Sequence, residues 1–230
     1  MTVSSNSVGV PERAGRAQLS APRANSRPDM PKTTPTTPPP RHGVTHASAM
    51  WRRLDVHGLE HFRFRLESAG PRLSGTVLLA DPGGPLRLDY DITCDAGWST
   101  RSAGVTLVRD TVTRRLSLSV DGRGRWKVDG EEAEALRGCV DVDVSLTPST
   151  NMLPIRRLGL GVGESREVTA AWVRLPELVV EPLPQRYTRL DERHYRYESR
   201  GGSFVAELEV DEAGVVVKYP PFWERVAAGG

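Results

Sequence analysis

The stretch LRLDYDI at residues 86–92 decides the fold class, because apolar side chains alternate strictly with charged ones along it. Successive side chains of a β-strand point to opposite faces, so a period of two predicts a strand with one buried face and one solvated face. The same alternation recurs at residues 62–66, 116–120, 140–146 and 204–210. Together these runs predict an all-β domain.

The residues between these runs are typical of turns, as in Asp81-Pro82-Gly83-Gly84, Asp121-Gly122 and Gly201-Gly202. Connections this short join antiparallel strands, since a parallel pair needs a crossover of about a dozen residues or more. A sheet of this size must curl or close to cover its apolar face. We therefore expect one large curved antiparallel sheet with a concave interior, and short helices only at residues 131–136, 149–158 and 222–226.

The composition divides the chain near residue 50. Residues 1–50 hold eight of the eighteen prolines, six Lys or Arg, two acidic residues and none of the fourteen aromatic residues. Such a segment lacks the apolar surface that would offset the entropy cost of ordering a chain. We expect a disordered N-terminal tail at residues 1–50 and a single β domain at residues 51–230.

The charge balance of the β domain argues against nucleic-acid binding. Residues 51–230 carry 25 basic and 27 acidic residues, a net charge of −2, whereas nucleic-acid binders present a clustered positive excess. No apolar run suits a secretion signal or a membrane span, so we expect a cytoplasmic location. Cys94 and Cys139 are too few for a disulfide framework, and the absence of metal or nucleotide motifs predicts no cofactor.

Few side chains offer catalytic chemistry. Asp141 and Asp143 lie on the same side of one predicted strand and could in principle form an acid/base pair. A solvated strand face explains both carboxylates more simply, and we expect them to lie in water. For His57 and His61 we likewise expect exposure to solvent rather than a shared metal ion.

Large amphipathic residues near turns and strand ends stand out instead. Aromatic rings offer flat apolar faces, while the arginine fork binds phosphate or carboxylate. The alternative is that the rings fill the core and the arginines decorate the surface. The candidate ligand-binding residues are Trp51, Arg53, Trp98, Arg101, Trp126, Asn151, Arg156, Arg157, Tyr187, Tyr195 and Tyr197.

The segment LTPSTNMLPIRRL at residues 146–158 breaks the alternation. Its apolar side chains, such as Met152, Leu153 and Ile155, could plug the concave face of the sheet while Arg156 and Arg157 reach past it. A fixed plug and a movable lid would look alike in sequence, and both interpretations stay open.

Several segments resemble a known bacterial family. They are WRRLD at 51–55, GLEHFR at 58–63, ITCDAGWSTRS at 92–102, GCVDVDVSLTPSTNMLPIRRL at 138–158, QRYTRL at 185–190, YRYES at 195–199 and ELEVDEAGVVVKYP at 207–220. In order and content they look like the putative glycolipid-binding family, formerly a domain of unknown function. The resemblance implies an open half-barrel with short helices at its mouth, similar to periplasmic lipoprotein-localisation factors. It also implies a lipid or glycolipid ligand, but it brings no binding residues with it.

The leading hypothesis is non-catalytic binding of a lipid or glycolipid, with the acyl chain in the concave face of the sheet and the headgroup held by Trp and Arg residues at its rim. It predicts a cavity that opens beside Trp98, Arg101 and Arg156. One alternative is an enzyme acting on such a ligand, in which Asp95 or Tyr195 would lie buried with Arg101. Another is a protein-interaction domain, which would expose an apolar patch or an unprotected edge strand.

Overall fold

The computed structural model describes residues 45–229, which form one large open β-sheet with a few short helical segments. Across the sheet the strands follow the order β8-β7-β6-β5-β4-β3-β2-β1-β15-β14-β13-β12-β11-β10-β9. The strands are β1 (His46–Arg53), β2 (Gly58–Glu67), β3 (Gly70–Asp81), β4 (Gly84–Cys94), β5 (Thr100–Arg109), β6 (Val112–Val120), β7 (Trp126–Val128), β8 (Glu131–Glu132), β9 (Asp141–Val144), β10 (Ser165–Arg174), β11 (Val179–Arg189), β12 (His194–Ser199), β13 (Phe204–Val210), β14 (Val216–Tyr219) and β15 (Trp223–Gly229). The helical segments are η1 (Glu134–Leu136), η2 (Ser149–Asn151), α1 (Met152–Leu158) and η3 (Arg200–Gly202).

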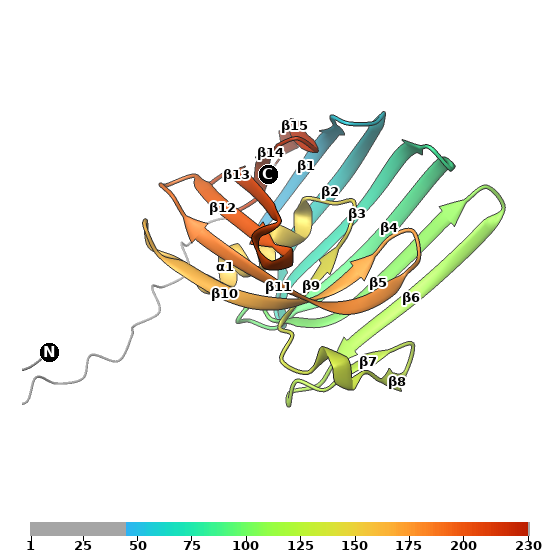
Figure 1. Cartoon of the computed structure of the whole chain (residues 1–230), viewed down its shortest axis with the longest axis horizontal. Helices are drawn as coiled ribbons and strands as arrows, with labels where there is room; N and C mark the ends of the chain where they lie inside the picture. The colour runs from blue at the N-terminus through green and yellow to red at the C-terminus, as the bar shows by residue number, and fades with distance from the viewer. Residues whose placement is uncertain (1–44, 230) are drawn as a thin grey trace, which may run out of the picture. The chain divides into compact units, whose positions relative to one another are not determined.

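The sheet has two arms, β1–β8 and β9–β15, which meet where β1 pairs with β15. In Figure 1 the strands β10 and β11 curve across in front of the first arm, and the helical turns of η2 and α1 lie between the arms. Two hydrogen bonds join the free edge of the second arm to the first: Thr100 N–H donates to Val140 O at 3.2 Å, and Val142 N–H donates to Thr100 Oγ1 at 3.0 Å. The large curved antiparallel sheet predicted from the alternation is confirmed.

One pair of strands departs from the antiparallel pattern. β9 runs parallel to β10, while every other pair within residues 45–229 is antiparallel. The connection between them contains η2 and α1, which supply the long crossover that a parallel pair requires. The break in alternation at residues 146–158 therefore marks this crossover.

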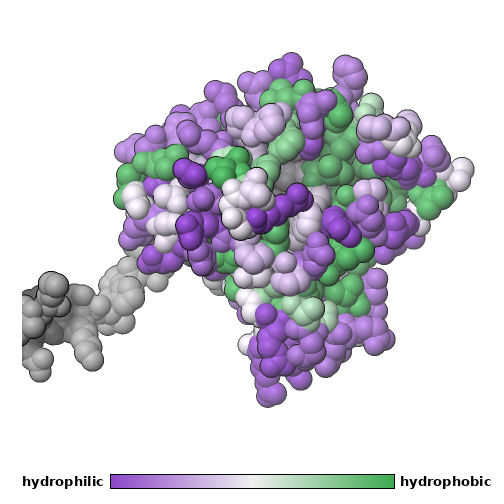
Figure 2. Space-filling model, in the orientation of Figure 1, coloured by the Kyte–Doolittle hydropathy of each residue, from purple (hydrophilic) through white to green (hydrophobic). Residues whose placement is uncertain are grey.

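The core lies on the inner, concave face of the sheet and between its arms. Inward side chains such as Trp51, Phe62 and Leu208 are fully buried. The crossover fills the space that the concave face encloses, because Met152 and Leu153 of α1 are also almost fully buried. Figure 2 shows that hydrophilic surface dominates the face in view, with hydrophobic surface visible between the arms. In this structure the segment acts as a plug.

Three expectations from the sequence need correction. Residues 222–226, expected as a helix, lie mostly in strand β15. The ordered sheet begins at His46, before the boundary expected at residue 51, because Ser48 and Ala49 pair with β15 on one side and with β2 on the other. Leu66, assigned to the buried face, is 49% exposed since it lies at the end of β2, beyond the covered part of the sheet. The rest of the predicted tail, residues 1–44, lies outside the described residues.

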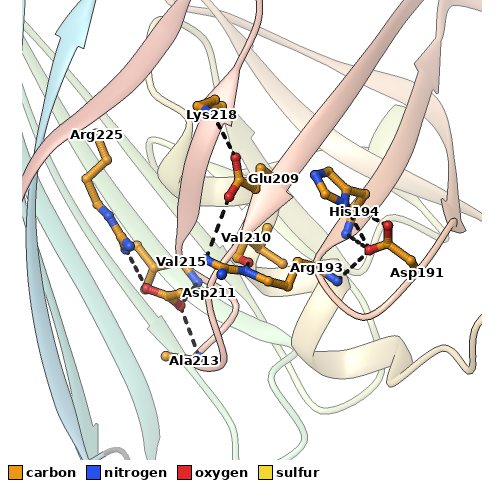
Figure 3. A network of polar contacts seen from close by, with 10 residues as sticks. All are labelled: Asp191, Arg193, His194, Glu209, Val210, Asp211, Ala213, Val215, Lys218 and Arg225. Atoms are coloured by element: carbon orange, nitrogen blue, oxygen red, sulfur yellow. Dashed lines mark hydrogen bonds and ion pairs between the residues drawn. The ribbon is translucent and has the colours of Figure 1, made fainter.

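A network of charged side chains secures the turns of the second arm (Figure 3). Asp211 Oδ1 accepts hydrogen bonds from the N–H groups of Ala213 and Val215, each at 3.0 Å, and Oδ2 pairs with Arg225 of β15. Asp191 holds the neighbouring turn through the ring and N–H of His194. These carboxylates are engaged in turn formation, which leaves them poorly suited to bind a ligand.

Replacing Gly75 with Ala should lower the free energy of unfolding by about 1–3 kcal/mol, the usual effect of overpacking a core. Gly75 faces Tyr90 across the sheet, and a Cβ there would lie 2.4 Å from Tyr90 Oη. The buried ring can move only by disturbing its hydrogen bond to Glu60. Gly104→Ala is the matched control, because an added Cβ in this neighbouring part of the sheet meets no atom within 4 Å. Urea unfolding of both variants checks the prediction, and equal stabilities would contradict it.

Candidate functional site

A buried polar segment, Thr147-Pro148-Ser149-Thr150-Asn151, connects β9 to α1 and lies against the inner face of both arms. Side-chain hydroxyls and amides are rarely buried without hydrogen-bond partners. Here Thr147 contacts Glu60 on the first arm, while Asn151 Oδ1 accepts a hydrogen bond from Tyr187 of the second arm at 2.9 Å. The segment therefore ties the two arms together through polar contacts inside an apolar core.

Glu60 is the least expected member of this polar cluster. Its side chain is fully buried, and Tyr90 Oη and Thr147 Oγ1 hydrogen-bond to its Oε1 at 2.5 and 2.7 Å. Its other oxygen, Oε2, has no hydrogen-bond partner among residues 45–229. Loss of solvation raises the pKa of Glu60 to about 8, although the two hydrogen bonds act in the opposite direction. The carboxyl group is therefore mostly protonated at neutral pH.

The sequence itself contains a signal for Glu60. Glu60 lies two residues before Phe62, so it belongs to the same inward face of β2 as Phe62 and Phe64. A carboxyl group on the inward face of a predicted strand is a candidate functional group because its burial must be compensated. Extending the alternating run by two residues would have found it.

The expectation that Asp141 and Asp143 lie in water is wrong. Asp141 is 1% exposed and forms a two-pronged ion pair with Arg157 of α1, Nε–Oδ1 at 3.0 Å and Nη2–Oδ2 at 2.5 Å. Burial raises the pKa of Asp141 above its ordinary value, although Arg157 opposes this. β9 is covered on both faces, since the crossover folds back over the side of the strand that would otherwise face water.

Asp143 shares this covered face. Gln185 of β11 donates a hydrogen bond from Nε2 to Asp143 Oδ2 at 2.6 Å, and Thr150 Oγ1 lies 3.4 Å from Oδ1. Loss of solvation raises the pKa of Asp143 to about 6, against the effect of these hydrogen bonds. The two aspartates thus belong to the inner polar cluster, each held by its own partner.

A polar groove of about 620 Å³ opens beside this cluster. Arg157 and Leu158 at the end of α1 form one side, and Gln185 and Ser199 contribute nearly buried polar groups from β11 and β12. We call this the polar groove. Its lining residues are Gly138, Val140, Arg157, Leu158, Glu167, Val168, Thr169, Pro184, Gln185, Arg186, Glu198, Ser199, Gly201 and Gly202.

A second groove, of about 810 Å³, lies at the strand ends of the first arm. Its apolar lining includes Leu59, Leu78, Pro85 and Val108, and Arg52 borders it. We call this the outer groove. Neither groove is lined by Trp98, Arg101 or Arg156, where the sequence predicts an opening.

The structure brings two of the predicted site residues together on the first arm. The guanidinium of Arg156 lies 4.9 Å from the ring of Trp98, which stacks on Phe64 with ring centroids 5.5 Å apart. Trp98 is only 8% exposed. Arg101 instead pairs with Asp95, Nη2–Oδ2 at 2.6 Å. These contacts fix α1 to the sheet rather than leaving Trp98 open to solvent.

The remaining predicted aromatic residues lie in the core. Trp51 and Trp126 donate their ring N–H groups to backbone carbonyls, Val216 O at 2.8 Å and Cys139 O at 3.0 Å. Tyr187 packs on Tyr197 at 5.2 Å between ring centroids. The guanidinium of Arg189 lies over the ring of Tyr195, which is buried. The guanidinium of Arg53 pairs with Asp55 and covers the rings of Phe222 and Trp223.

A sequence model described as putative glycolipid-binding matches residues 48–225, almost the whole sheet. The chain belongs to the putative glycolipid-binding family. The chain is also similar to the crystal structure of a DUF1089 family protein from Pseudomonas aeruginosa, which is 40% identical in sequence. That match covers 73% of this chain and 92% of the other, with a TM-score of 0.66. No curated protein matches the sequence.

Two further observations describe this glycolipid-binding-family protein. Within residues 45–229 no helix has the length and apolar character needed to cross a membrane. In the same part of the chain, His, Cys, Asp and Glu side chains do not gather in groups of three or more that could hold a metal ion. The polar cluster and the two grooves are therefore the candidate functional features of residues 45–229.

The glycolipid-binding-family domain should lose stability as the pH rises from about 6 to 8, by up to about 1.4 kcal/mol per pH unit, because of Glu60. A carboxyl group whose folded pKa lies near 8 binds more protons in the folded than in the unfolded state over this range, so deprotonation favours unfolding. Glu60→Gln keeps a neutral group and should flatten the dependence, whereas the exposed Glu131→Gln should not. Chemical unfolding at several pH values measures both slopes. Identical slopes for wild type and Glu60→Gln would contradict this assignment.

Proposed function

We propose that the chain binds a glycolipid without chemically altering it, with the sugar headgroup in the polar groove and the acyl chains directed toward α1. The observation that carries the proposal is the position of this groove, directly beside the segment that fills the apolar inner face of the sheet. A ligand with one polar and one apolar end matches two such neighbouring environments. Small-molecule sites commonly combine an apolar lining with a few fixed polar groups in this way.

The polar groups of the groove suit hydroxyl-rich ligands. Gln185 and Ser199 are held on paired strands at matching positions, so their side chains are presented side by side from rigid elements. Amide and hydroxyl groups can both donate and accept hydrogen bonds, as sugar hydroxyls do.

The charges of the groove favour a neutral sugar over a phosphate headgroup. Arg157 is neutralised by the buried Asp141, and Arg186 pairs with Glu167 across β10 and β11. Glu198, also in the lining, lies 3.6 Å from Arg196. With each arginine in the lining matched by a carboxylate, the groove offers a phosphate little net attraction.

The acyl chains need the inner face of the sheet, which α1 occupies. Leu158 and Val168 border the polar groove on this side. α1 has seven residues and lacks a side-chain N-cap, and the left-handed residue Gly159, φ 54°, ends it. Short helices owe their stability mainly to tertiary contacts, so α1 is suited to move when an acyl chain replaces those contacts.

The enzyme alternative has less support. Asp95 does pair with Arg101, but both side chains remain partly exposed, at 29% and 41%. The buried Glu60 has a shifted pKa, yet neither groove is lined by it. An acid or base must reach its substrate within hydrogen-bond distance, which this enclosed position does not favour.

Removing the hydroxyl of Ser199 in the polar groove should weaken binding of a diacylglycerol that carries one neutral hexose. For Ser199→Ala we expect about 2- to 13-fold weaker binding, since a lost neutral hydrogen bond contributes about 0.5–1.5 kcal/mol. Titration of the full chain, followed by native mass spectrometry, measures the affinity. Ser119→Ala removes the same group on the outer face of β6 and serves as the matched control.

The same diacylglycerol without the hexose should bind at least about tenfold more weakly than the glycosylated form. Equal affinity for both lipids would show that the sugar is not recognised. Equal losses in the groove variant and its control would show that the polar groove is not the site.

A further inference from the structure

The outer face of the first arm carries an unusual apolar row. Arg52, Leu59, Leu78, Arg87 and Val108 are direct neighbours across β1 to β5, so their side chains form one line on the outer face. Leu59 is 44% exposed and Leu78 is 53% exposed. This row lines the outer groove, together with Ala80 and Pro85 at the strand ends.

The position of this row distinguishes it from isolated exposed leucines. Leu59 and Leu78 face each other in adjacent strands, and Val108 extends the apolar surface beyond Arg87. Single exposed apolar residues need no explanation, but contiguous ones rimmed by polar groups mark interaction surfaces. The buried inner face gives no reason for these leucines, because their side chains point away from it.

Positive charge lies along the same face, next to the apolar row. His61, Arg63 and Arg65 follow Leu59 at intervals of two along β2, so they share its outward face. The side chains of Arg63 and Arg65 make no hydrogen bond or ion pair with any residue in the range 45–229. Two exposed arginines without a counter-charge in this range are available for an external anion.

The charge balance of this face differs from that of the domain. On the outward positions of β1–β4 there are five arginines, Arg52, Arg63, Arg65, Arg72 and Arg87, against three acidic residues, Glu67, Asp89 and Asp91. Residues 51–230 as a whole carry a net charge of −2. Arg52, Arg72 and Arg87 pair with Glu224, Asp91 and Asp89, so among the described residues the positive charge without a partner on this face lies on Arg63 and Arg65.

We infer that the outer face of β1–β5 docks on a lipid bilayer that contains anionic lipid, with Leu59 and Leu78 entering the boundary between headgroups and acyl chains. Arg63 and Arg65 contact the lipid phosphates, and Arg52 and Arg87 flank the inserted leucines with their long apolar stems. Peripheral binding combines burial of apolar area with attraction to anionic lipid, and this face offers both. A nucleic acid would satisfy the arginines but would leave the leucines exposed.

This surface shares no lining residue with the polar groove, so docking does not require a glycolipid to be bound. A protein that takes an amphipathic ligand from a membrane must reach that membrane, and docking by the outer face uses residues other than those of the polar groove. The inference thus extends the proposed function, yet it can be tested separately because the test vesicles need contain no sugar.

The test is flotation of the full chain with phosphatidylcholine vesicles, either pure or containing about one-third phosphatidylglycerol. Wild type should bind the anionic vesicles at least about tenfold more tightly than the neutral ones, and binding should weaken as salt rises from about 0.05 to about 0.5 M. Arg63→Gln/Arg65→Gln should lower the affinity about 30-fold. Leu59→Ser/Leu78→Ser should lower it by a similar factor at unchanged net charge.

Matched controls separate this surface from general effects. Arg123→Gln/Lys127→Gln removes the same charge from exposed positions outside this face, and Leu190→Ser changes a leucine of similar exposure, 41%, on the turn after β11. Both should bind as wild type does. Ser199→Ala, in the polar groove, should also bind these sugar-free vesicles normally, so failure of docking and failure of glycolipid binding are distinguishable.

The inference would be overturned if wild type bound neutral and anionic vesicles equally. It would also be overturned if the leucine variant bound like wild type while the arginine variant did not, because the face would then be a purely electrostatic site suited to a different polyanion.

Discussion

The inner apolar face of a single wide sheet must be covered, and most features of this protein follow from how it is covered. An open sheet that buried nothing on its concave side would expose rings and aliphatic chains such as Phe62, Leu88 and Leu208. The two arms curve toward each other, and the crossover that connects β9 to β10 fills the space between them. The crossover brings polar backbone and side chains with it, and these must find partners inside the core. Glu60, Asp141 and Asp143 supply partners for the crossover, which explains why carboxyl groups with raised pKa values gather there.

The same constraint explains which features the sequence could predict. Alternation in residues 86–92 reports which side chains share a face, and β4 is buried on the expected side. It could not report that a second element would cover the other face of β9, so Asp141 looked solvated although Arg157 lies against it. For a similar reason, the sequence could not divide the candidate aromatic residues into core residues and rim residues. A tryptophan at a strand end fits a core or a rim equally well by composition, and only the fold places Trp51 inside and Trp98 beneath Arg156. The helix predicted at residues 222–226 is wrong. Two prolines precede this segment, and the strand with which it pairs, β1, lies at the other end of the domain sequence, so the local sequence gives no sign of the pairing.

The two faces of the first arm place different demands on the same strands. In β2, Glu60, Phe62 and Phe64 point inward while Leu59, His61, Arg63 and Arg65 point outward. An outer face that only had to remain in water would need no leucines, and one that bound only anions would need no apolar groove. The inner face is constrained by packing, as the close approach of Gly75 to Tyr90 shows. Core packing places no such constraint on the outer face, so its combination of leucine and arginine is better explained by a partner than by folding.

The energetics of the plug set a condition on the ligand. Met152, Leu153 and Ile155 are nearly fully buried, and burying such a side chain contributes about 1.5–3 kcal/mol, or about 5–9 kcal/mol for the three. An acyl chain gains about 0.8 kcal/mol for each CH₂ group that it buries, so about 6–11 methylene groups would replace the apolar contacts of α1. Membrane lipid tails are longer than this, which leaves a surplus to offset the broken polar ties, chiefly the pair of Arg157 with Asp141. A short-chain amphiphile would not reach that balance. Under the proposed function, occupation of the inner face would therefore select for ligands with long acyl chains, while the polar groove beside it would select among their headgroups.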